Sequence, residues 1–278
     1  MSFLRFRRIV TKIIKHSILG LVALIGVIPF LLILVTSLKR PNEAIVTPPK
    51  LIFTPTFDSY ITLLGNVDFL RSVMNSLVIA GSATFLGTII AVLAGYALSR
   101  FRVRGGNVIA YTILFLRMVP PITFVIPYFL IWRTLRLSDT YIAMILMYIT
   151  LCLPMLIWML RSFFLDFPIE IEEAALVDGC SRWQMLRLIA IPAVMPGILA
   201  SATLAFISLW NEFMFALFNT GSNTRTLPIE IYNSIGYYQL DWARLSSTAV
   251  VAVIPAIIFI ALTQKYLVRG LTMGAVKG

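Results

Sequence analysis

The residues best suited to a specific ionic contact form a short polar segment in the second half of the chain. Three carboxylates, Glu170, Glu172 and Glu173, follow Pro168, and Gly179 comes after a further run of small and apolar residues. Proline and acidic residues favour the first turn of a helix, and glycine favours the position just beyond its end. The pattern predicts a short helix that ends at a bend and offers a carboxylate to a basic partner. An ordinary capped loop would carry the same pattern.

A second helix is predicted directly after this bend. Ser181 and Gln184 are spaced as in a capping box, and Met185 begins an amphipathic stretch that runs to Pro192. Because proline disfavours helical geometry at the residue before it, we expect this helix to end near Pro192. Residues 161–188 are therefore expected to contain two short helices that meet at a sharp bend.

Motifs for catalysis, metal binding and nucleotide binding are not evident. His16 is the single histidine, and Cys152 and Cys180 lie far apart without metal-ligand neighbours, so neither a zinc site nor a disulfide framework is indicated. No glycine is followed directly by lysine, which argues against a P-loop and therefore against ATPase activity. We expect no catalytic residue, no metal site and no cofactor in this chain.

The composition is that of a membrane protein. Of 278 residues, 59% are hydrophobic and 13% are charged, whereas soluble domains average about 25% charged residues. The formal charge of +11 could suggest nucleic acid as a partner. In a chain this apolar, however, basic residues are expected to flank the spans and to face anionic lipid. We therefore predict an all-α membrane protein that contacts lipid and does not bind nucleic acid.

Six stretches are long and apolar enough to cross a bilayer as helices, which takes about 20 residues each. They are residues 17–38, 72–99, 107–132, 141–160, 189–211 and 245–264. Prolines inside them are tolerated in membrane helices, and we expect kinks rather than breaks. The segments between the stretches are too short for a folded domain, so residues 1–278 are predicted to form a single transmembrane domain.

The basic residues predict which side of the membrane each connection faces. If the N-terminus is cytoplasmic, 14 of the 23 lysines and arginines lie in inner segments and eight in outer loops, as the positive-inside rule expects. The first stretch has 22 uncharged residues, more than the core of a cleaved signal peptide, and we expect it to be kept as an anchor. Both termini are therefore expected on the cytoplasmic side.

The segment between the fourth and fifth stretches resembles the EAA loop of membrane subunits of binding-protein-dependent ABC importers. The matching residues are Glu173-Ala174-Ala175, Gly179, Ile189 and Ile191-Pro192, with Ile191 in place of the leucine of the family pattern. Further matches along nearly the whole chain point to the carbohydrate-uptake group that includes the maltose-type transporters. They include Asn75-Ser76-Leu77, Ala94-Gly95-Tyr96-Ala97, Met118-Val119-Pro120-Pro121, Trp210-Asn211-Glu212-Phe213 and Thr226-Leu227-Pro228.

The resemblance implies a type I ABC importer permease fold, with six transmembrane helices and a short cytoplasmic coupling-helix loop between helices 4 and 5. In that family the first helix of the loop docks on a cytoplasmic ATPase. The matching positions here are Glu173, Ala174, Ala175, Asp178 and Gly179. The implied partners are an ABC ATPase dimer that binds ATP and Mg²⁺, a second permease subunit and an extracytoplasmic solute-binding protein. The implied location is the bacterial cytoplasmic (inner) membrane, and the implied solute is a sugar or a sugar-like compound.

Four polar residues in or beside the stretches are candidates for the solute pathway: Arg117, Tyr148, Asn211 and Glu212. Arg117 interrupts an apolar stretch, where a charge is costly unless it is solvated or paired, so we expect it to face protein or water. It could line the pathway, or it could pair with backbone carbonyls or snorkel. Asn211 and Glu212 follow Trp210, whose indole could anchor the membrane interface or contact a sugar ring.

An ion-coupled transporter is the main alternative class. Such proteins are expected to carry ionisable residues deep in their spans and an inverted repeat. Arg117 is the single charged residue within the six stretches, and the sequence shows no internal repeat. A membrane-embedded enzyme would need a base or metal ligands near mid-membrane, and no acidic residue lies inside a stretch. The sequence favours an importer subunit over both.

Overall fold

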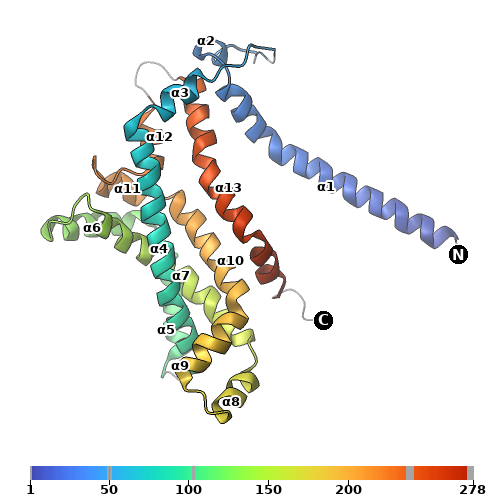
Figure 1. The fold of residues 1–278 in the computed structure, drawn as a ribbon, viewed down its shortest axis with the longest axis vertical. Helices are drawn as coiled ribbons and strands as arrows, with labels where there is room; N and C mark the ends of the chain where they lie inside the picture. The colour runs from blue at the N-terminus through green and yellow to red at the C-terminus, as the bar shows by residue number, and fades with distance from the viewer. Residues whose placement is uncertain (1, 49, 51, 102–103, 236–240, 274–278) are drawn as a thin grey trace. The chain divides into compact units, whose positions relative to one another are not determined.

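A computed structural model of the protein describes residues 2–48, 50, 52–101, 104–235 and 241–273. Within these ranges the chain is helical and contains no strand (Figure 1). The elements are α1 (Ser2–Ser37), α2 (Pro41–Ala44), α3 (Asp58–Leu64), α4 (Val67–Arg100), α5 (Gly106–Leu116), α6 (Ile122–Thr134), α7 (Tyr141–Asp166), α8 (Ile169–Val177), α9 (Arg182–Met185), η1 (Leu186–Ala190), α10 (Ile191–Trp210), α11 (Met214–Asn219), α12 (Leu227–Asn233) and α13 (Trp242–Met273). The chain divides into two compact units, residues 1–67 with 233–253, and residues 68–232 with 254–278.

Five of the six expected spans are helices that are long and apolar enough to cross a membrane. Counted over the described residues, they are Thr11–Ser37, Val67–Arg100, Tyr141–Asp166, Arg182–Trp210 and Trp242–Tyr266. The most apolar window of the first one, in α1, is 0% buried. Its apolar surface is therefore available to lipid or to another chain.

The third expected span is a broken helix, which corrects the expectation of kinks alone. Arg117 is the C-cap residue of α5, and α6 does not begin until Ile122. Pro120 and Pro121 between them remove two successive N–H donors and restrict the residue that precedes each ring, so a continuous helix cannot pass this point. Each half is shorter than a span requires. Isolated prolines elsewhere lie inside continuous helices, as expected.

The segment between the fourth and fifth spans is helical, but its second helix is not short. The side chains of Ser181 and Gln184 form the predicted capping box at the start of α9. The helix then continues through η1, a turn of π-helix, into α10 instead of ending near Pro192. We attribute the wide turn to Pro192, because a proline ring lacks an N–H and crowds the carbonyl four residues earlier. A π-turn accommodates both effects without ending the helix.

Small residues in the second unit let α4 and α7 approach each other closely. Four of them recur at a spacing of four along one buried face of α4, namely Ala83, Gly87, Ala91 and Gly95. A Cβ added at Gly87 would lie 2.8 Å from Cys152 Sγ, and one added at Gly95 would lie 3.0 Å from the Arg161 backbone nitrogen. Such spacing of small residues is typical of helices that pack tightly in membranes.

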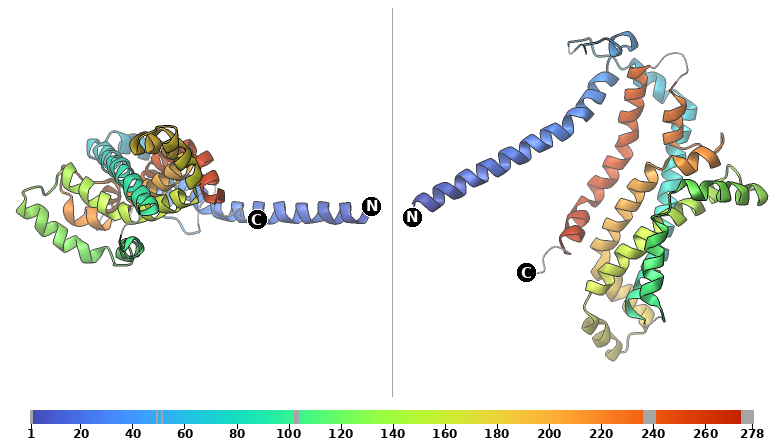
Figure 2. Two further views of the ribbon diagram at one scale, coloured as in Figure 1. Left: turned by 90° about the horizontal axis from the view of Figure 1, so that it is seen from below. Right: turned by 180° about the vertical axis from the view of Figure 1, so that it is seen from behind.

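The order of these contacts shows that α4 and α7 run parallel. Cys152 lies near Ala83 and Arg161 lies near Gly95, so both contacts advance along both helices in the same direction. The C-terminal ends of the two helices therefore meet at one end of the unit, where α8 and α9 also lie (Figures 1 and 2). Their N-terminal ends meet at the other end, where the Tyr141 hydroxyl donates a hydrogen bond of 2.6 Å to the Asn75 side chain.

Gly95→Ala tests the close approach of α4 and α7. The new Cβ would lie 3.0 Å from the Arg161 nitrogen and 3.2 Å from the Leu160 carbonyl carbon, so one backbone must move. We expect a destabilisation of about 1–3 kcal/mol, the usual cost of overpacking, seen as a lower melting temperature of the purified protein. Gly81→Ala is the matched control, because a Cβ at Gly81 meets nothing within 4 Å. Equal melting temperatures for the two variants would contradict the packing described.

Candidate coupling helix and solute cavity

The helix α8 is sharply bounded at its C-terminal end. Gly179 adopts φ +89°, the left-handed conformation that glycine takes at low cost. Its N–H donates to the Leu176 carbonyl at 3.2 Å, and the N–H of the next residue donates to the Ala175 carbonyl at 3.0 Å. These two bonds define a Schellman ending. The predicted bend at Gly179 is confirmed.

The residues expected to dock on an ATPase are divided between the surface and the interior. Glu173, Ala174 and Asp178 are exposed, together with the glycine at the bend. Ala175, expected on the docking surface, is 5% exposed and packs inside its own chain. Val177, which the sequence did not single out, is 87% exposed. The outer surface of α8 therefore combines carboxylates with apolar area.

A buried ion pair anchors α8 to the end of α4. Arg100 Nε donates to Glu172 Oε1 at 2.7 Å, and the two side chains are 8% and 5% exposed. Arg100 Nη2 donates to the Phe167 carbonyl at 2.6 Å, and the Tyr96 hydroxyl donates to Glu172 Oε2 at 3.1 Å. Both carboxylate oxygens are therefore partnered, as a buried charge requires. Removing one member of such a pair costs about 3–5 kcal/mol, because the other charge is left buried and unpaired.

Sequence reasoning missed this ion pair. Glu172 was expected only to favour the start of a helix, and Arg100 only to flank a span. The two residues are 72 positions apart, and no local pattern connects them. The one available indication was that Tyr96 and Arg100 are four residues apart, so that they share a face at the end of a predicted helix.

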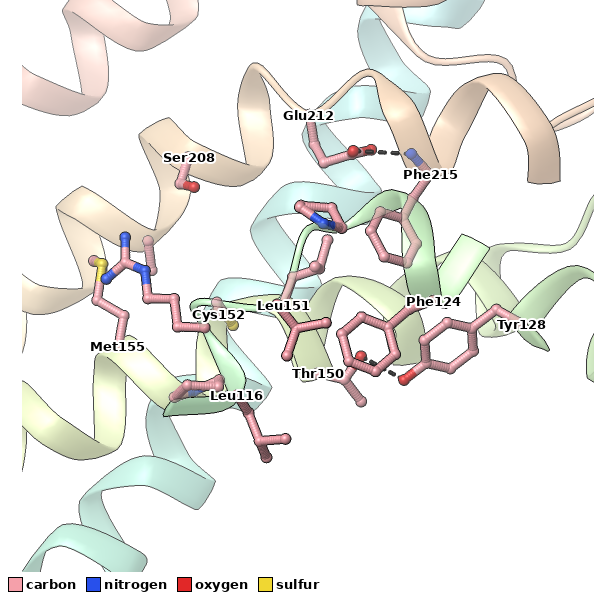
Figure 3. A pocket seen from close by; sticks show the side chains of 15 residues that line it. Leu116, Phe124, Tyr128, Thr150, Leu151, Cys152, Met155, Ser208, Glu212 and Phe215 are labelled. Atoms are coloured by element: carbon pink, nitrogen blue, oxygen red, sulfur yellow. Dashed lines mark hydrogen bonds between the residues drawn. The ribbon is translucent and has the colours of Figure 1, made fainter. Parts of the chain in front are cut away.

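A cavity of about 380 Å³ lies at the break in the third span (Figure 3). The break between α5 and α6 contributes to its wall, together with α6, α7, α10 and α11. Aromatic rings and hydroxyl groups are prominent in the lining, including Phe124, Tyr128, Thr150, Ser208 and Phe215. The Tyr128 hydroxyl donates to Thr150 Oγ1 at 2.8 Å. The size of the cavity and its mixture of apolar and polar groups are typical of small-molecule sites.

Two of the four predicted pathway residues line this cavity, Arg117 and Glu212. Arg117 is exposed, and no described residue accepts a hydrogen bond from its side chain. Tyr148 is 1% exposed and does not line this cavity. The Asn211 amide donates to the Ile207 carbonyl at 2.8 Å, and Asn211 lies outside the cavity wall.

The Glu212 carboxylate is tied to the first turn of α11. One oxygen accepts the Phe215 N–H at 2.9 Å, and the other accepts the Ala216 N–H at 3.2 Å (Figure 3). Burial raises the pKa of the Glu212 carboxyl, and these N–H groups oppose the rise only in part. Its negative charge is thus used within the chain, by the N–H groups at the start of α11. Arg117 is the charge in the cavity wall for which the described residues supply no counterpart.

At the end of the unit opposite α8, Asp139 holds a loop that precedes α12. It accepts hydrogen bonds of 2.8–3.1 Å from the N–H groups of Gly221, Asn223 and Thr224, and one of 2.6 Å from the Thr224 hydroxyl. Partial burial acts to raise the pKa of the Asp139 carboxyl, but these hydrogen bonds outweigh burial and lower the pKa below its usual value. The loop is therefore fixed by a charged side chain from between α6 and α7.

The same loop is also held by the N-terminal part of α4. The Asn75 amide donates to the carbonyls of Asn223 and Arg225 at 3.0 and 2.8 Å. The Ser76 hydroxyl accepts the Leu227 N–H at 2.7 Å. In the sequence, Asn75 and Ser76 were part of a resembled motif. Their position shows that they satisfy backbone groups of a segment about 150 residues later.

Curated relatives align with nearly the whole chain. The probable ABC transporter permease protein y4oR of Sinorhizobium fredii is 35% identical over 255 residues, which cover 92% of each chain. The sulfoquinovosyl glycerol transport system permease protein SmoH of Agrobacterium fabrum is 36% identical, over 91% of this chain and 90% of that relative. The trehalose/maltose transport system permease protein MalG of Thermococcus litoralis is 35% identical, over 93% and 94%.

A solved structure shares the fold. A chain in the crystal structure of a bacterial ABC transporter involved in the import of the acidic polysaccharide alginate superposes with a TM-score of 0.76. The alignment covers 92% of this chain and 96% of that one, at 24% identity. At this level of identity the likeness concerns the arrangement of the helices.

The family match covers α8, the bend at Gly179 and the cavity together. The model of the family described as "Binding-protein-dependent transport system inner membrane component" matches residues 83–273, well over half of the chain. The relatives named above agree with that match over more than nine tenths of the chain. The protein is therefore a member of the family of inner membrane components of binding-protein-dependent transport systems, the permease subunits of ABC importers.

Proposed function

We propose that the chain forms one half of the transmembrane pathway of an importer for a sugar or a sugar-like solute. The names of the trehalose/maltose and sulfoquinovosyl glycerol relatives support a sugar. The observation that carries the proposal is that one compact unit holds both a solute-sized cavity at a helix break and an exposed short helix at one end. The chain itself is proposed to carry no catalytic site, and a separate ABC ATPase dimer binds ATP and Mg²⁺.

The cavity is suited to a sugar by its shape and its lining. Irregular backbone at membrane depth is tolerated where it lines a cavity, which is the situation of the break before Pro121. Rings such as Tyr128 and Phe124 offer flat apolar faces to a pyranose ring. The hydroxyls of Thr150 and Ser208 offer hydrogen bonds to its substituents. Binding in this way would orient a ring without requiring a charge on it.

The charge of the cavity further favours a solute with an anionic group. The guanidinium of Arg117 lies in the wall without a hydrogen bond to the described residues, while the carboxylate of Glu212 is used by the start of α11. A carboxylate or sulfonate on the sugar would complement Arg117 by two parallel hydrogen bonds. The sulfoquinovosyl glycerol and trehalose/maltose relatives are named for different sugars, so membership of the family does not by itself select the solute.

Three partners complete the proposed importer. The exposed surface of α8, with Glu173 and Asp178, is the docking surface for the ATPase. The loop fixed by Asp139 lies at the opposite end of the unit and is on the side of the solute-binding protein. A second permease subunit closes the pathway, and the uncovered apolar surface of α1 supports contact with another chain or with lipid.

The proposed orientation places both termini, residues 100–106 and residues 161–188 in the cytoplasm. It is supported by the excess of lysine and arginine in these segments. A cysteine introduced at Arg182 should react with a membrane-impermeant maleimide only in inside-out vesicles, and one at Arg225 only in intact cells stripped of their outer barrier. Labelling of position 182 from the exterior would overturn the orientation.

Glu173→Ala and Gly179→Val test the docking surface. Loss of one charge-assisted contact removes about 1.5–3 kcal/mol, enough to weaken ATPase binding tenfold or more. Valine at Gly179 cannot adopt φ +89° without strain and would misdirect α9. We expect both variants to insert normally but to retain less ATPase on co-purification and to lose uptake.

Two matched controls accompany these variants. Asp58→Ala removes an exposed carboxylate from the first turn of α3, and Gly179→Asn keeps a residue that tolerates the left-handed conformation. Both controls should retain the ATPase. Full ATPase retention and full uptake in Glu173→Ala and Gly179→Val would show that α8 is not the docking surface.

Arg117→Gln tests recognition of an anionic group. Uptake would be compared for glucuronate and glucose, which differ in one carboxylate, in proteoliposomes that contain the complete importer. We expect the ratio of glucuronate to glucose uptake to fall about tenfold or more, from the loss of a charged hydrogen bond. Arg133→Gln, an exposed arginine outside the cavity wall, should leave the ratio unchanged. Failure of Arg117→Gln to accumulate, or an unchanged ratio, would indicate a structural role for Arg117.

A further inference from the structure

The end of α4 is a junction that contacts three other helices. Its core is the α4 anchor, which we define as Tyr96, Arg100 and Glu172. Besides the hydrogen bonds within it, the Tyr96 ring lies edge-on to Phe164 of α7 at 5.4 Å between centroids. The Tyr96 hydroxyl also lies 4.0 Å from Met185 Sδ of α9. One turn of α4 thus contacts α7, α8 and α9.

The anchor spans the hinge between α7 and α8. Phe167 and Pro168 at this hinge have extended backbone, with ψ of 126° and 129°, so no helical hydrogen bonds carry rigidity from α7 into α8. Arg100 bridges the gap, because one guanidinium nitrogen bonds the Phe167 carbonyl and another bonds Glu172 beyond the hinge. The planar guanidinium fixes the relative direction of these two bonds. The helix α8 is therefore held more firmly to α4 than its own connection to α7 would allow.

The same helix carries a second set of side-chain contacts at its other end. Asn75 and Ser76 hold the carbonyls of Asn223 and Arg225 and the N–H of Leu227. From Asn75 to Arg100 the helix is uninterrupted, which corresponds to about 38 Å at 1.5 Å per residue. Both ends of α4 are thus fixed to segments that lie far away in the sequence.

We propose that α4 is the mechanical link of the permease, with Arg100 and Glu172 as the positioning residues that transmit displacement of α8 to the loop held by Asn75. The inference rests on the proposed docking of the ATPase at α8 and adds the route by which its movement reaches the other end. Glu173 faces outward and serves docking, whereas Glu172, one residue before it, faces inward and serves transmission. Docking and transmission can therefore be separated by adjacent substitutions.

The test measures two quantities for each variant in the complete importer. These are ATPase retention on co-purification, and the stimulation of ATP hydrolysis by solute-loaded binding protein. We expect Glu172→Gln and Arg100→Met to retain the ATPase and its basal hydrolysis, but to lose most of the stimulation, at least fivefold, the lower range of allosteric coupling. Asn75→Ala, at the other end of α4, should likewise retain the ATPase and lose most of the stimulation. Asp166→Asn, which neutralises an exposed carboxylate at the end of α7 and outside the docking surface, is the matched control and should behave as wild type.

A double variant tells transmission from general destabilisation. If Arg100 acts through Glu172, Arg100→Met with Glu172→Gln should reduce stimulation no further than the worse single variant. Tyr96→Phe removes only one hydroxyl and keeps the ring contacts, so it tests the anchor even where the charge variants fail to accumulate. It should lower stimulation while leaving the amount of complex unchanged.

The outcomes separate this proposal from the docking proposal. Wild-type stimulation in Glu172→Gln, or in Tyr96→Phe where the charge variants do not accumulate, would overturn the link. Loss of ATPase from Glu172→Gln to the same extent as from Glu173→Ala would also overturn it, because Glu172 would then serve docking. Full ATPase retention in Glu173→Ala together with uncoupling in Glu172→Gln would instead refute docking through Glu173 and leave the α4 link standing.

Discussion

Close packing of α4 against α7 determines where the ends of both helices lie, and most features of the second unit follow from it. In a bilayer the hydrophobic effect does not drive helices together, so association depends on van der Waals contact and on satisfied polar groups. The small residues of α4 that end at Gly95 allow the backbones of α4 and α7 to come within contact distance. Because the helices are parallel, Arg100 arrives beside the start of α8 and Asn75 beside the start of α7. If α4 and α7 lay farther apart, neither Arg100 nor Asn75 would reach its hydrogen-bond partners.

The α4 anchor and the cavity differ in how their charges are compensated. At the α4 anchor the ionic groups are buried and each oxygen of Glu172 has a donor. Such an arrangement fixes a geometry, because any displacement would leave a charge unpaired in a region of low dielectric. In the cavity Arg117 is exposed and keeps its donors available. The first arrangement suits a connection that must stay rigid, and the second suits a group that meets a changing partner.

Two interruptions of regular helix within the expected spans of this unit, counted over the described residues, have a proline as the physical cause. The pair Pro120-Pro121 ends α5 and opens the cavity wall. Pro192 follows the π-turn through which the α9 helix passes into α10. The difference between a break and a widened turn follows from the number of donors lost, two successive ones in the first case and one in the second. The break at Pro120-Pro121 lies beside the cavity, and the π-turn before Pro192 follows α8 and the bend at Gly179.

The sequence alone determined the features that depend on neighbouring residues. The apolar stretches predicted five of the spanning helices, and the bend at Gly179 and the capping box at Ser181 were predicted from their local patterns. Such features are predictable because their hydrogen bonds close within a few positions of the chain. The break at Pro120-Pro121 also has a local cause. The sequence predicted only a kink there, because single prolines are tolerated in membrane helices.

The tertiary structure alone decided which polar residues meet. Arg100 and Glu172 are 72 positions apart, and Asn75 and Arg225 are 150 apart. Their pairing depends on the register of α4 against α7, which a spacing of small residues permits without specifying. Tertiary packing also places Ala175 and Tyr148 inside the chain and leaves Glu173 and Arg117 exposed. Residue type indicated that the charged and hydroxyl-bearing side chains needed polar partners. Only packing between distant helices determined which partners each side chain received.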